Sequence, residues 1–358
     1  MRVAFFFGTL NRGGAETLVS DVLMQKGSLP FDAVCVYRKE GNLSEAFHKS
    51  GAPMLRLPRK RSWVVYVLRL RRLLKREHVD ILHAQTSLNA IVGVFCTLFT
   101  PIKLVTTFHG FGFVGSPRIL KRLVFRGSDR IVFVSDYLKQ GFVERGVFGC
   151  ENKCVVIHNG INFSKFKDIT YHGNTDDRVR MCMVGSFGEG RNHLFVCQFL
   201  NALREKGCDF HFTFVGAARE SEREIYDKCV DYCRQHDLER YVTFAGLRND
   251  VPELLSEMDA FVYATRHDSF GIAVIEAIAA GLPTFVNDWC VMQEITHNGQ
   301  FATLYKTDDI NALCARFDDF LANRQAYRLR ARDNAEEIRR LYSIEQHVLS
   351  LAQCYNSL

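Results

Sequence analysis

The sequence predicts an α/β protein built from two doubly wound parallel sheets. Short apolar or β-branched runs alternate with helical patterns along the whole chain. A polar stretch without periodicity, FSKFKDITYHGNTDDR at 163–178, interrupts this alternation near the middle and is expected to be a linker. At 358 residues the chain is also longer than one hydrophobic core usually serves. We therefore expect two domains.

The expected strands follow one another in a regular order on either side of the polar stretch. In the first half they are RVAFFF (2–7), FDAVCVY (31–37), PMLRLP (53–58), DILHAQ (80–85), KLVTTFH (103–109), RIVFVS (130–135) and CVVIHNG (154–160). In the second half they are VRMCMVGS (179–186), FHFTFVG (210–216), YVTFAG (241–246), AFVYA (260–264), PTFVN (283–287) and FATLY (301–305). A largely helical tail is expected from about Asp308.

Composition is that of a globular protein. Hydrophobic residues make up 47% and charged residues 24%, which excludes a largely disordered chain. No window reaches the ~18 uninterrupted apolar residues of a spanning helix. Only five apolar residues follow Arg2 before Gly8, too few for a signal peptide, so a cytoplasmic location is expected.

The cysteines do not form a recognisable framework. The chain has 12 of them, scattered through expected strands and helices, which favours free cytosolic thiols over disulfides. Cys150 with Cys154 and Cys229 with Cys233 have CxxxC spacing but no neighbouring ligand cluster. Buried packing is therefore favoured over a zinc site.

Charge is distributed unevenly. Residues 1–170 hold 26 Lys and Arg against 12 Asp and Glu, a balance of +14, whereas the remainder holds 20 against 28, a balance of −8. The segment 56–76 has nine basic and no acidic residues, with Trp63, Val64, Val67, Leu70 and Leu74 near helical spacing. A second cationic helix is expected at 116–126.

Two uses of this basic surface are open. We expect it to dock on the anionic cytoplasmic leaflet of a membrane. An ordinary amphipathic helix packed on its sheet is the alternative, and no motif supports nucleic-acid binding. The candidate membrane contacts are Arg59, Lys60, Arg61, Arg69, Arg72, Lys121 and Arg122.

Glycine-rich turns follow the first strand of each half. They are FFFGTLNRGGAET at 5–17, with a helix from near Ala15, and MVGSFGEGRNH at 183–193. Glycine lets backbone approach a ligand, and a helix N-terminus offers free N–H groups to phosphate. Neither turn matches the dinucleotide or Walker pattern, so NAD and ATP have little support. Arg191 could reach an anion held by the second turn, although a structural turn with a solvated arginine is the alternative.

A pair of carboxylates brackets a third helix start. HDSFG precedes a helix expected from near Gly271, and Glu276 lies roughly 7.5 Å along its axis at ~1.5 Å per residue. An unpaired carboxylate in this apolar run would be costly. A diphosphate between Asp268 and Glu276, with sugar hydroxyls at both carboxylates, would satisfy it. Alternatively, Asp268 caps the helix and Glu276 pairs with a buried arginine.

The stretch DSFGIAVIEAIAAGLPTF at 268–285 resembles the E-x7-E signature of glycosyltransferase family 4, retaining enzymes that use nucleotide-sugar donors. Further motifs lie in family order: NRGGAE (11–16), DILHAQ (80–85), TTFHGF (106–111), VIHNGIN (156–162), VGSFGEGRNH (184–193) and FAGLRNDVPELLSEMDAFVYAT (244–265). The resemblance implies the GT-B fold, two Rossmann-like domains facing each other across a cleft. It implies an acceptor-binding domain at 1–165, a nucleotide-sugar-binding domain at 179–342, and a C-terminal helix at 343–358 that crosses back to the first.

The resemblance also implies roles for single residues. Gly13 and Gly14 would bring backbone near the donor phosphates and the acceptor. His109 would lie beside the transferred sugar at the reaction centre. Where the family usually has an Arg and a Lys on the diphosphate, this chain has Ser186 and Arg191.

The remaining implied roles concern the second domain. Asp268 stands where the family usually has Glu and would contact sugar hydroxyls with a shorter arm. Phe270 and Gly271 would present N–H groups to phosphate, Glu276 would hold the ribose, and the backbone of Leu247 would contact the base.

The expected function is retaining transfer of a hexose or N-acetylhexosamine, from a UDP-sugar first of all, to a glycan or lipid-linked acceptor in surface polysaccharide, lipopolysaccharide or capsule synthesis. A GT-B nucleotide-sugar epimerase and a non-catalytic nucleotide-sugar-binding protein are the alternatives. No D-x-D pair is found, since the Asp pairs at 176, 308 and 318 lack that spacing. We therefore expect neither a metal nor another cofactor, and a location on the inner face of the cytoplasmic membrane.

Overall fold

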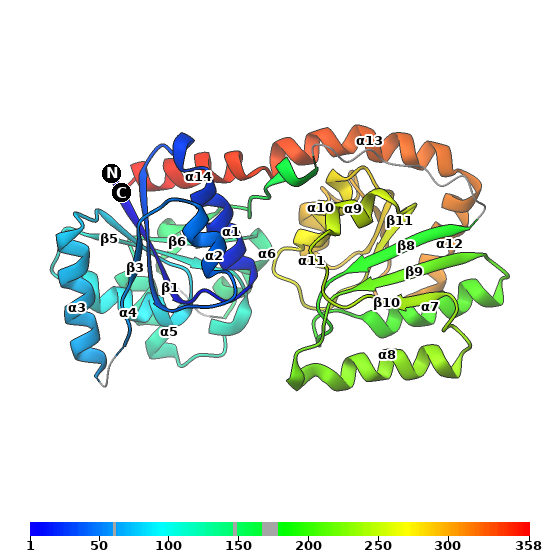
Figure 1. Ribbon diagram of the computed structural model, residues 1–358, viewed down its shortest axis with the longest axis horizontal. Helices are drawn as coiled ribbons and strands as arrows, with labels where there is room; N and C mark the ends of the chain where they lie inside the picture. The colour runs from blue at the N-terminus through cyan, green and yellow to red at the C-terminus, as the bar shows by residue number, and fades with distance from the viewer. Residues whose placement is uncertain (60–61, 146–148, 167–177) are drawn as a thin grey trace. The chain divides into compact units, whose positions relative to one another are not determined.

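The computed structural model describes residues 1–59, 62–145, 149–166 and 178–358. They form two compact units, each of which is described by itself (Figure 1). The first contains Met1–Asn162 and Tyr342–Leu358, and the second contains Phe163–Leu341. Lys60, Arg61 and most of the expected linker lie outside the described residues.

The first unit is a seven-stranded parallel sheet in the order β3-β2-β1-β4-β5-β6-β7. Its strands are β1 (Arg2–Thr9), β2 (Asp32–Lys39), β3 (Met54–Arg56), β4 (Ile81–Ala84), β5 (Lys103–Phe108), β6 (Arg130–Phe133) and β7 (Cys154–Val156). Its α-helices are α1 (Gly14–Met24), α2 (Ser44–Lys49), α3 (Trp63–Arg76), α4 (Ser87–Thr97), α5 (Arg118–Gly127), α6 (Asp136–Val143) and α14 (Ile344–Asn356).

The second unit is a six-stranded parallel sheet in the order β10-β9-β8-β11-β12-β13. Its strands are β8 (Val179–Val184), β9 (Phe210–Val215), β10 (Val242–Phe244), β11 (Ala260–Tyr263), β12 (Thr284–Asn287) and β13 (Thr303–Tyr305). Its α-helices are α7 (His193–Glu205), α8 (Arg223–Gln235), α9 (Val251–Ser256), α10 (Ile272–Ala279), α11 (Cys290–Ile295), α12 (Ile310–Ala322) and α13 (Arg324–Leu341).

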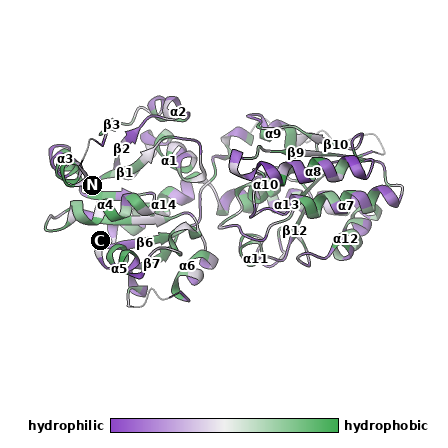
Figure 2. Ribbon diagram, turned by 90° about the horizontal axis from the view of Figure 1, so that it is seen from below, coloured by the Kyte–Doolittle hydropathy of each residue, from purple (hydrophilic) through white to green (hydrophobic). Residues whose placement is uncertain are grey.

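The strand pattern follows from burial on both faces. Parallel strands covered by helices on each side consist of near-continuous apolar runs, and β1, β4, β11 and β12 are of this kind. The helices instead alternate between hydrophobic and hydrophilic positions, as α7 and α8 show in Figure 2. Each expected strand overlaps a strand of the structure, and β1 and β2 run two residues beyond the expected ranges, so the predicted α/β class is confirmed.

The sheet orders locate the ligand-binding edges. In each sheet the order reverses between two neighbouring strands, β1 with β4 in the first unit and β8 with β11 in the second. Ligands of doubly wound sheets bind beyond the carboxyl ends of strands at such a switch point. The turns after β1, β4, β8 and β11 therefore lie where a ligand is expected to bind.

The last helix belongs to the first unit. The backbone N–H of Ile161 donates to the Tyr342 carbonyl at 2.8 Å, and the N–H of Ile344 donates to the Ile161 carbonyl at 3.0 Å. Gly160 allows this approach, because a Cβ there would lie 2.6 Å from the Cβ of His347. Residues of α14 then join the core formed by β1, β2 and α1.

The apolar stripe of α3 is only partly covered by the rest of the unit. Tyr66, Leu70 and Leu74 are buried, whereas Trp63 and Val64 are exposed. The alternative of an ordinary amphipathic helix packed on its sheet therefore holds for Leu70 and Leu74 but not for Trp63 and Val64. The helix has more apolar side chains than its contact with the unit can cover.

All twelve cysteines are free, as expected, and both CxxxC pairs are buried. Within the described residues, no helix combines the length and the apolar character needed to cross a bilayer.

Candidate active site

Two loops at the switch point of the second sheet are bonded to each other. The Gly190 carbonyl, in the turn after β8, accepts hydrogen bonds from the Thr265 hydroxyl at 2.8 Å and from the N–H groups of Arg266 and His267 at 2.9 and 3.1 Å. A Cβ at Gly190 would lie 2.6 Å from the His267 carbonyl oxygen. This glycine thus serves loop-to-loop contact, a use that the sequence analysis did not consider.

The paired loops bring Arg191 and Asp268 to a common partner, Tyr263. The Arg191 Nε donates to the Tyr263 hydroxyl at 2.8 Å, and that hydroxyl donates to the Asp268 Oδ2 at 2.6 Å. Burial raises the pKa of Tyr263, so the phenol stays neutral and can do both. The result is a chain of hydrogen bonds from a guanidinium to a carboxylate.

Arg191 is also held at its other end. Its Nη1 donates to the Ser186 hydroxyl at 2.8 Å, and a Cβ at Gly185 would lie 2.7 Å from the Arg191 side chain. No hydrogen-bond partner for its Nη2 is found among the described residues. A fixed guanidinium with remaining N–H donors is suited to a phosphate oxygen.

The helix predicted from near Gly271 is α10, which begins one residue later. Gly271 is its N-cap with φ +96°, and a Cβ there would lie 2.8 Å from the Met292 Cε, so the position needs glycine on both counts. Glu276 is half-buried in the second turn of this helix, and Phe270 is buried in front of it. Asp268 and Glu276 therefore flank the N-terminus of α10, where partial positive charge favours anions.

The other predicted positions of the second unit take no part in the hydrogen bonds between Arg191, Tyr263 and Asp268. Leu247 is exposed after β10. Asp309 caps α12 by accepting from the Ala312 N–H, and Asp308 accepts from Arg266. Asp318 pairs with Lys206. The described Asp pairs thus take capping and ion-pair roles, and the pair at 176 lies outside the described residues.

In the first unit, His109 follows β5 at the switch-point edge. Its Nε2 lies 2.9 Å from the Oε1 of Gln85, the residue after β4. Because an amide oxygen only accepts, this pairing puts the proton on Nε2. Burial, reinforced by His347, lowers the pKa of His109 to about 3, so its ring is neutral near pH 7.

The N-terminus of α1 is partly occupied by its own side chain. Gly13 is the N-cap and Gly14 the first helical residue, with open space where a Cβ of Gly14 would lie. A Cβ at Gly13, however, would lie 2.5 Å from a carboxylate oxygen of Glu16. An ionised Glu16 opposes a phosphate at this helix end, and burial raises its pKa.

Comparisons with known proteins identify the family of the chain. The family model described as Glycosyltransferase Family 4 matches residues 12–165, and the model described as Glycosyl transferases group 1 matches residues 164–338. The chain belongs to glycosyltransferase family 4. Its activity is that of a glycosyltransferase.

Individual relatives of this family 4 protein are distant. The UDP-Gal:alpha-D-GlcNAc-diphosphoundecaprenol alpha-1,3-galactosyltransferase of Escherichia coli is 25% identical over 72% of this chain and 71% of its own length. The putative glycosyltransferase EpsF of Bacillus subtilis is 24% identical over 80% of this chain and 79% of its own length.

Solved structures identify the fold as GT-B. Anabaena Alr3699/HepE, in complex with UDP and glucose, has a TM-score of 0.85 over 100% of both chains at 16% identity. The apo form of the lipopolysaccharide outer core galactosyltransferase WaaB has a TM-score of 0.75 over 100% of this chain and 99% of its own, at 14% identity.

The family 4 signature located most of this site but not Tyr263. That tyrosine ends an ordinary-looking core strand, AFVY, and only its place at the switch point reveals its polar role. Gln85 was not among the predicted residues either, although it ends the DILHAQ motif and immediately follows β4.

Proposed function

We propose that this glycosyltransferase moves a hexose or N-acetylhexosamine from a UDP-sugar to a glycan or lipid-linked acceptor, with retention and without a divalent metal. Surface polysaccharide, lipopolysaccharide or capsule synthesis is the corresponding setting. The names of relatives support this proposal, since they include a galactosyltransferase acting from UDP-Gal onto a diphosphoundecaprenol acceptor, a lipopolysaccharide core mannosyltransferase and a capsular polysaccharide glycosyltransferase.

The observation that carries the proposal is the Arg191–Tyr263–Asp268 chain beside α10. In our assignment the donor diphosphate accepts from Arg191 and from the first N–H groups of α10, around Phe270 and Gly271. Asp268 and Glu276 then bind hydroxyls of the sugar and of the ribose. The second unit is thus the donor domain and the first unit the acceptor domain.

Charge development supports the same assignment. When the glycosidic bond to phosphate breaks, negative charge grows on the leaving diphosphate and the sugar becomes oxocarbenium-like. Fixed donors aimed at that charge lower the barrier most effectively. Arg191 and the α10 N-terminus supply such donors, and the leaving phosphate takes the proton of the acceptor hydroxyl. A neutral His109 contributes a hydrogen bond to the sugar rather than a positive charge.

The donor is tested by measuring the melting temperature with UDP-, GDP- and ADP-sugars, each with and without EDTA. We expect UDP-sugars to raise it equally in both conditions, because a ligand of the native state stabilises by mass action. Glu276→Ala should abolish the rise. A rise that needs metal would contradict the metal-free assignment.

Turnover is tested with radiolabelled UDP-sugar and a lipid-linked acceptor. The anomeric configuration of the product is then determined by NMR. His109→Ala and Glu276→Ala should both lose transfer while remaining folded. Donor hydrolysis and transfer no faster than in a protein-free control, for the wild type as well as both variants, would favour a binding protein over an enzyme. An inverted product would contradict retention.

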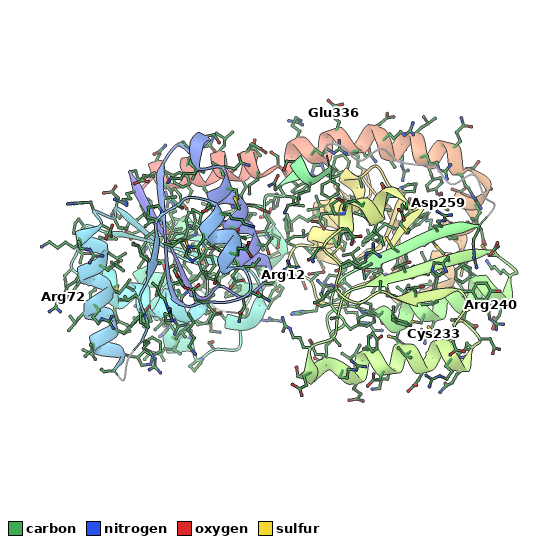
Figure 3. The ribbon with its side chains drawn as sticks, in the orientation of Figure 1. Arg12, Arg72, Cys233, Arg240, Asp259 and Glu336 are labelled. Atoms are coloured by element: carbon green, nitrogen blue, oxygen red, sulfur yellow. The ribbon has the colours of Figure 1, made fainter. Side chains whose placement is uncertain are left out.

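We also propose that the first unit docks on the anionic inner leaflet of the cytoplasmic membrane. Helix α4 packs against both α3 and α5, and apolar side chains protrude from this layer, with Val64 69%, Ile119 75% and Phe99 95% exposed. Arg72 extends from α3 away from the unit (Figure 3), and Arg122 is exposed on α5. Apolar side chains among cations fit a leaflet of anionic lipid.

The other candidate cations contribute differently. Arg59 lies over the Trp63 ring at 4.6 Å, which holds that exposed indole beside a positive charge. Arg69 donates to the Pro58 carbonyl at 3.1 Å, and Lys121 donates to the Val114 carbonyl at 3.0 Å. Arg69 and Lys121 are thus engaged in hydrogen bonds within the unit and contribute less to the docking surface.

Co-sedimentation with phosphatidylglycerol vesicles tests the docking surface. Binding should be strong at low salt and weaker at high salt, because salt screens exposed charges. Phe99→Ser should weaken it, whereas Leu329→Ser, an equally simple change at an exposed leucine of the second unit, should not. Equal binding by the two variants would contradict docking through α3, α4 and α5.

A further inference from the structure

A small cavity lined by both polar and apolar side chains lies beside His109 in the first unit. Side chains from the ends of β4, β5 and β7 line it together with α14, and the polar ones are His83, Gln85, Thr107, His109, Asn159 and His347. The free space in it is about 10 Å³, which is about what one water molecule needs.

Two side chains at this cavity have unmet hydrogen-bonding groups. Gln85 is 4% exposed and Asn159 is 6% exposed. Within the described parts of the chain, neither the Gln85 Nε2 nor the Asn159 Oδ1 has a hydrogen-bond partner. Buried polar groups are rarely left in this state, and an ordered water usually satisfies them.

His347 supplies a third polar atom. Its Nδ1 donates to the His158 carbonyl at 2.7 Å, so its Nε2 is an acceptor. The cavity therefore combines one donor, on Gln85, with two acceptors, on Asn159 and His347. A water molecule can satisfy all three atoms, since it can accept the hydrogen bond from the donor and donate one to each acceptor.

We propose that this cavity binds one ordered water, which accepts from Gln85 and donates to Asn159 and His347, and that α14 thereby fixes the ring of His109. Gln85 transmits the constraint, because its other amide atom, Oε1, accepts from the His109 Nε2. Gln85 and His347 are positioning residues, and His109 is the group they position. The consequence for catalysis rests on the proposed role of His109 at the reaction centre.

The anchoring of α14 makes this coupling effective. The Ile161–Tyr342 and Ile344–Ile161 backbone bonds fix the first turn of the helix against the loop that carries His158 and Asn159. At the other end of the helix, the Tyr355 hydroxyl lies 2.6 Å from the His83 Nδ1, whose Nε2 lies 2.7 Å from the Thr107 hydroxyl. Helix α14 thus places two polar side chains inside the first unit.

The wild-type protein provides the first test, and it needs no activity. A crystal structure of the full chain that resolves ordered waters should place one within hydrogen-bond distance of Gln85, Asn159 and His347. Ring 15N shifts should show His109 as the Nε2–H tautomer. A dry cavity, or a mixture of His109 tautomers, would overturn the proposal even if the enzyme transfers sugar.

The variant His347→Asn tests the positioning role. Its amide can still donate to the His158 carbonyl, but it has no atom at the Nε2 position. We expect a loss of the His109 tautomer preference and a fall in kcat of about ten- to a hundredfold, as misplaced catalytic groups give, with the KM for the donor little changed. The matched control is Gln346→Ala, an exposed neighbour on α14, which should behave as wild type.

The outcomes separate this inference from the proposed function. A wild-type protein without transfer would refute the proposed function, while the ring spectrum and the bound water would still decide the inference. A folded His347→Asn protein with wild-type kcat would overturn the positioning role. If the variant does not fold, the wild-type structure and ring spectrum remain decisive.

Discussion

Acid should destabilise the first unit through its buried histidines, and His83 provides the sharpest case. His83 is fully buried, with both ring nitrogens bonded inside the fold. Burial, reinforced by His109 and His347, lowers its pKa from 6.5 to about 3. Between these values the unfolded chain binds a proton that the folded chain does not. The contribution of neutral His83 to the stability of the fold is therefore fully present above pH 6.5 and is lost as the pH falls towards 3.

The magnitude follows from this difference in proton binding. One imidazole that stays neutral in the fold and has a pKa near 6.5 in the unfolded chain lowers the free energy of unfolding by about 2 kcal/mol between pH 7 and pH 5. His347 is also buried, with its pKa lowered to about 4, and contributes a similar amount. Together the two histidines should remove about 4 kcal/mol, a large part of the ~5–15 kcal/mol that stabilises a typical domain.

The assay must report each unit separately, because a two-domain chain need not unfold in one step. Urea unfolding followed by hydrogen exchange of peptides from β4 and β11 meets this need. We compare wild type, His83→Gln and the matched control His48→Gln, which removes an exposed histidine of the same unit. In His83→Gln the loss of β4 stability between pH 7 and pH 5 should be smaller by about 2 kcal/mol. An equal loss in all three proteins would refute the reasoning.

Three further changes test the second unit. Tyr263→Phe should lower kcat/KM about tenfold without unfolding the protein, because Arg191 loses its link to the Asp268 carboxylate. An unchanged kcat/KM would exclude a role for the Tyr263 hydroxyl. Arg191→Lys should weaken UDP binding in calorimetry, since lysine lacks the planar fork, and adding Ser186→Arg, which restores the usual family pair, should recover part of the loss. Arg328→Ala should destabilise the second unit by about 3–5 kcal/mol in urea, because it removes the cation 2.6 Å from the buried Asp259; a shift below 1 kcal/mol would show that other donors satisfy this carboxylate.

Much of the fold could be predicted because its signals are local. The apolar runs, the glycine turns after β1 and β8 and the helix start at Gly271 depend on neighbouring residues and on backbone preference. The same signals made Arg191, Asp268 and Glu276 candidate site residues, since each lies within a few residues of a helix start. His109 became a candidate because it directly follows a strand.

Other features depend on which strands become neighbours and on which helix covers them. Nothing local in AFVY indicates that the Tyr263 hydroxyl joins Arg191 to Asp268, because that contact requires β8 beside β11. The exposure of Trp63 and Val64 could not be decided from the sequence, because periodicity identifies an apolar face but not how much of it the sheet can cover.

The sequence by itself therefore determined the class of the fold, its thirteen expected strands and the loops that carry the candidate site. Only the tertiary structure decided how those loops are joined, and that the last helix brings His347 to the cavity beside His109. The physical reason is that hydrogen bonds between distant segments depend on sheet order and helix packing, which no short stretch of sequence specifies.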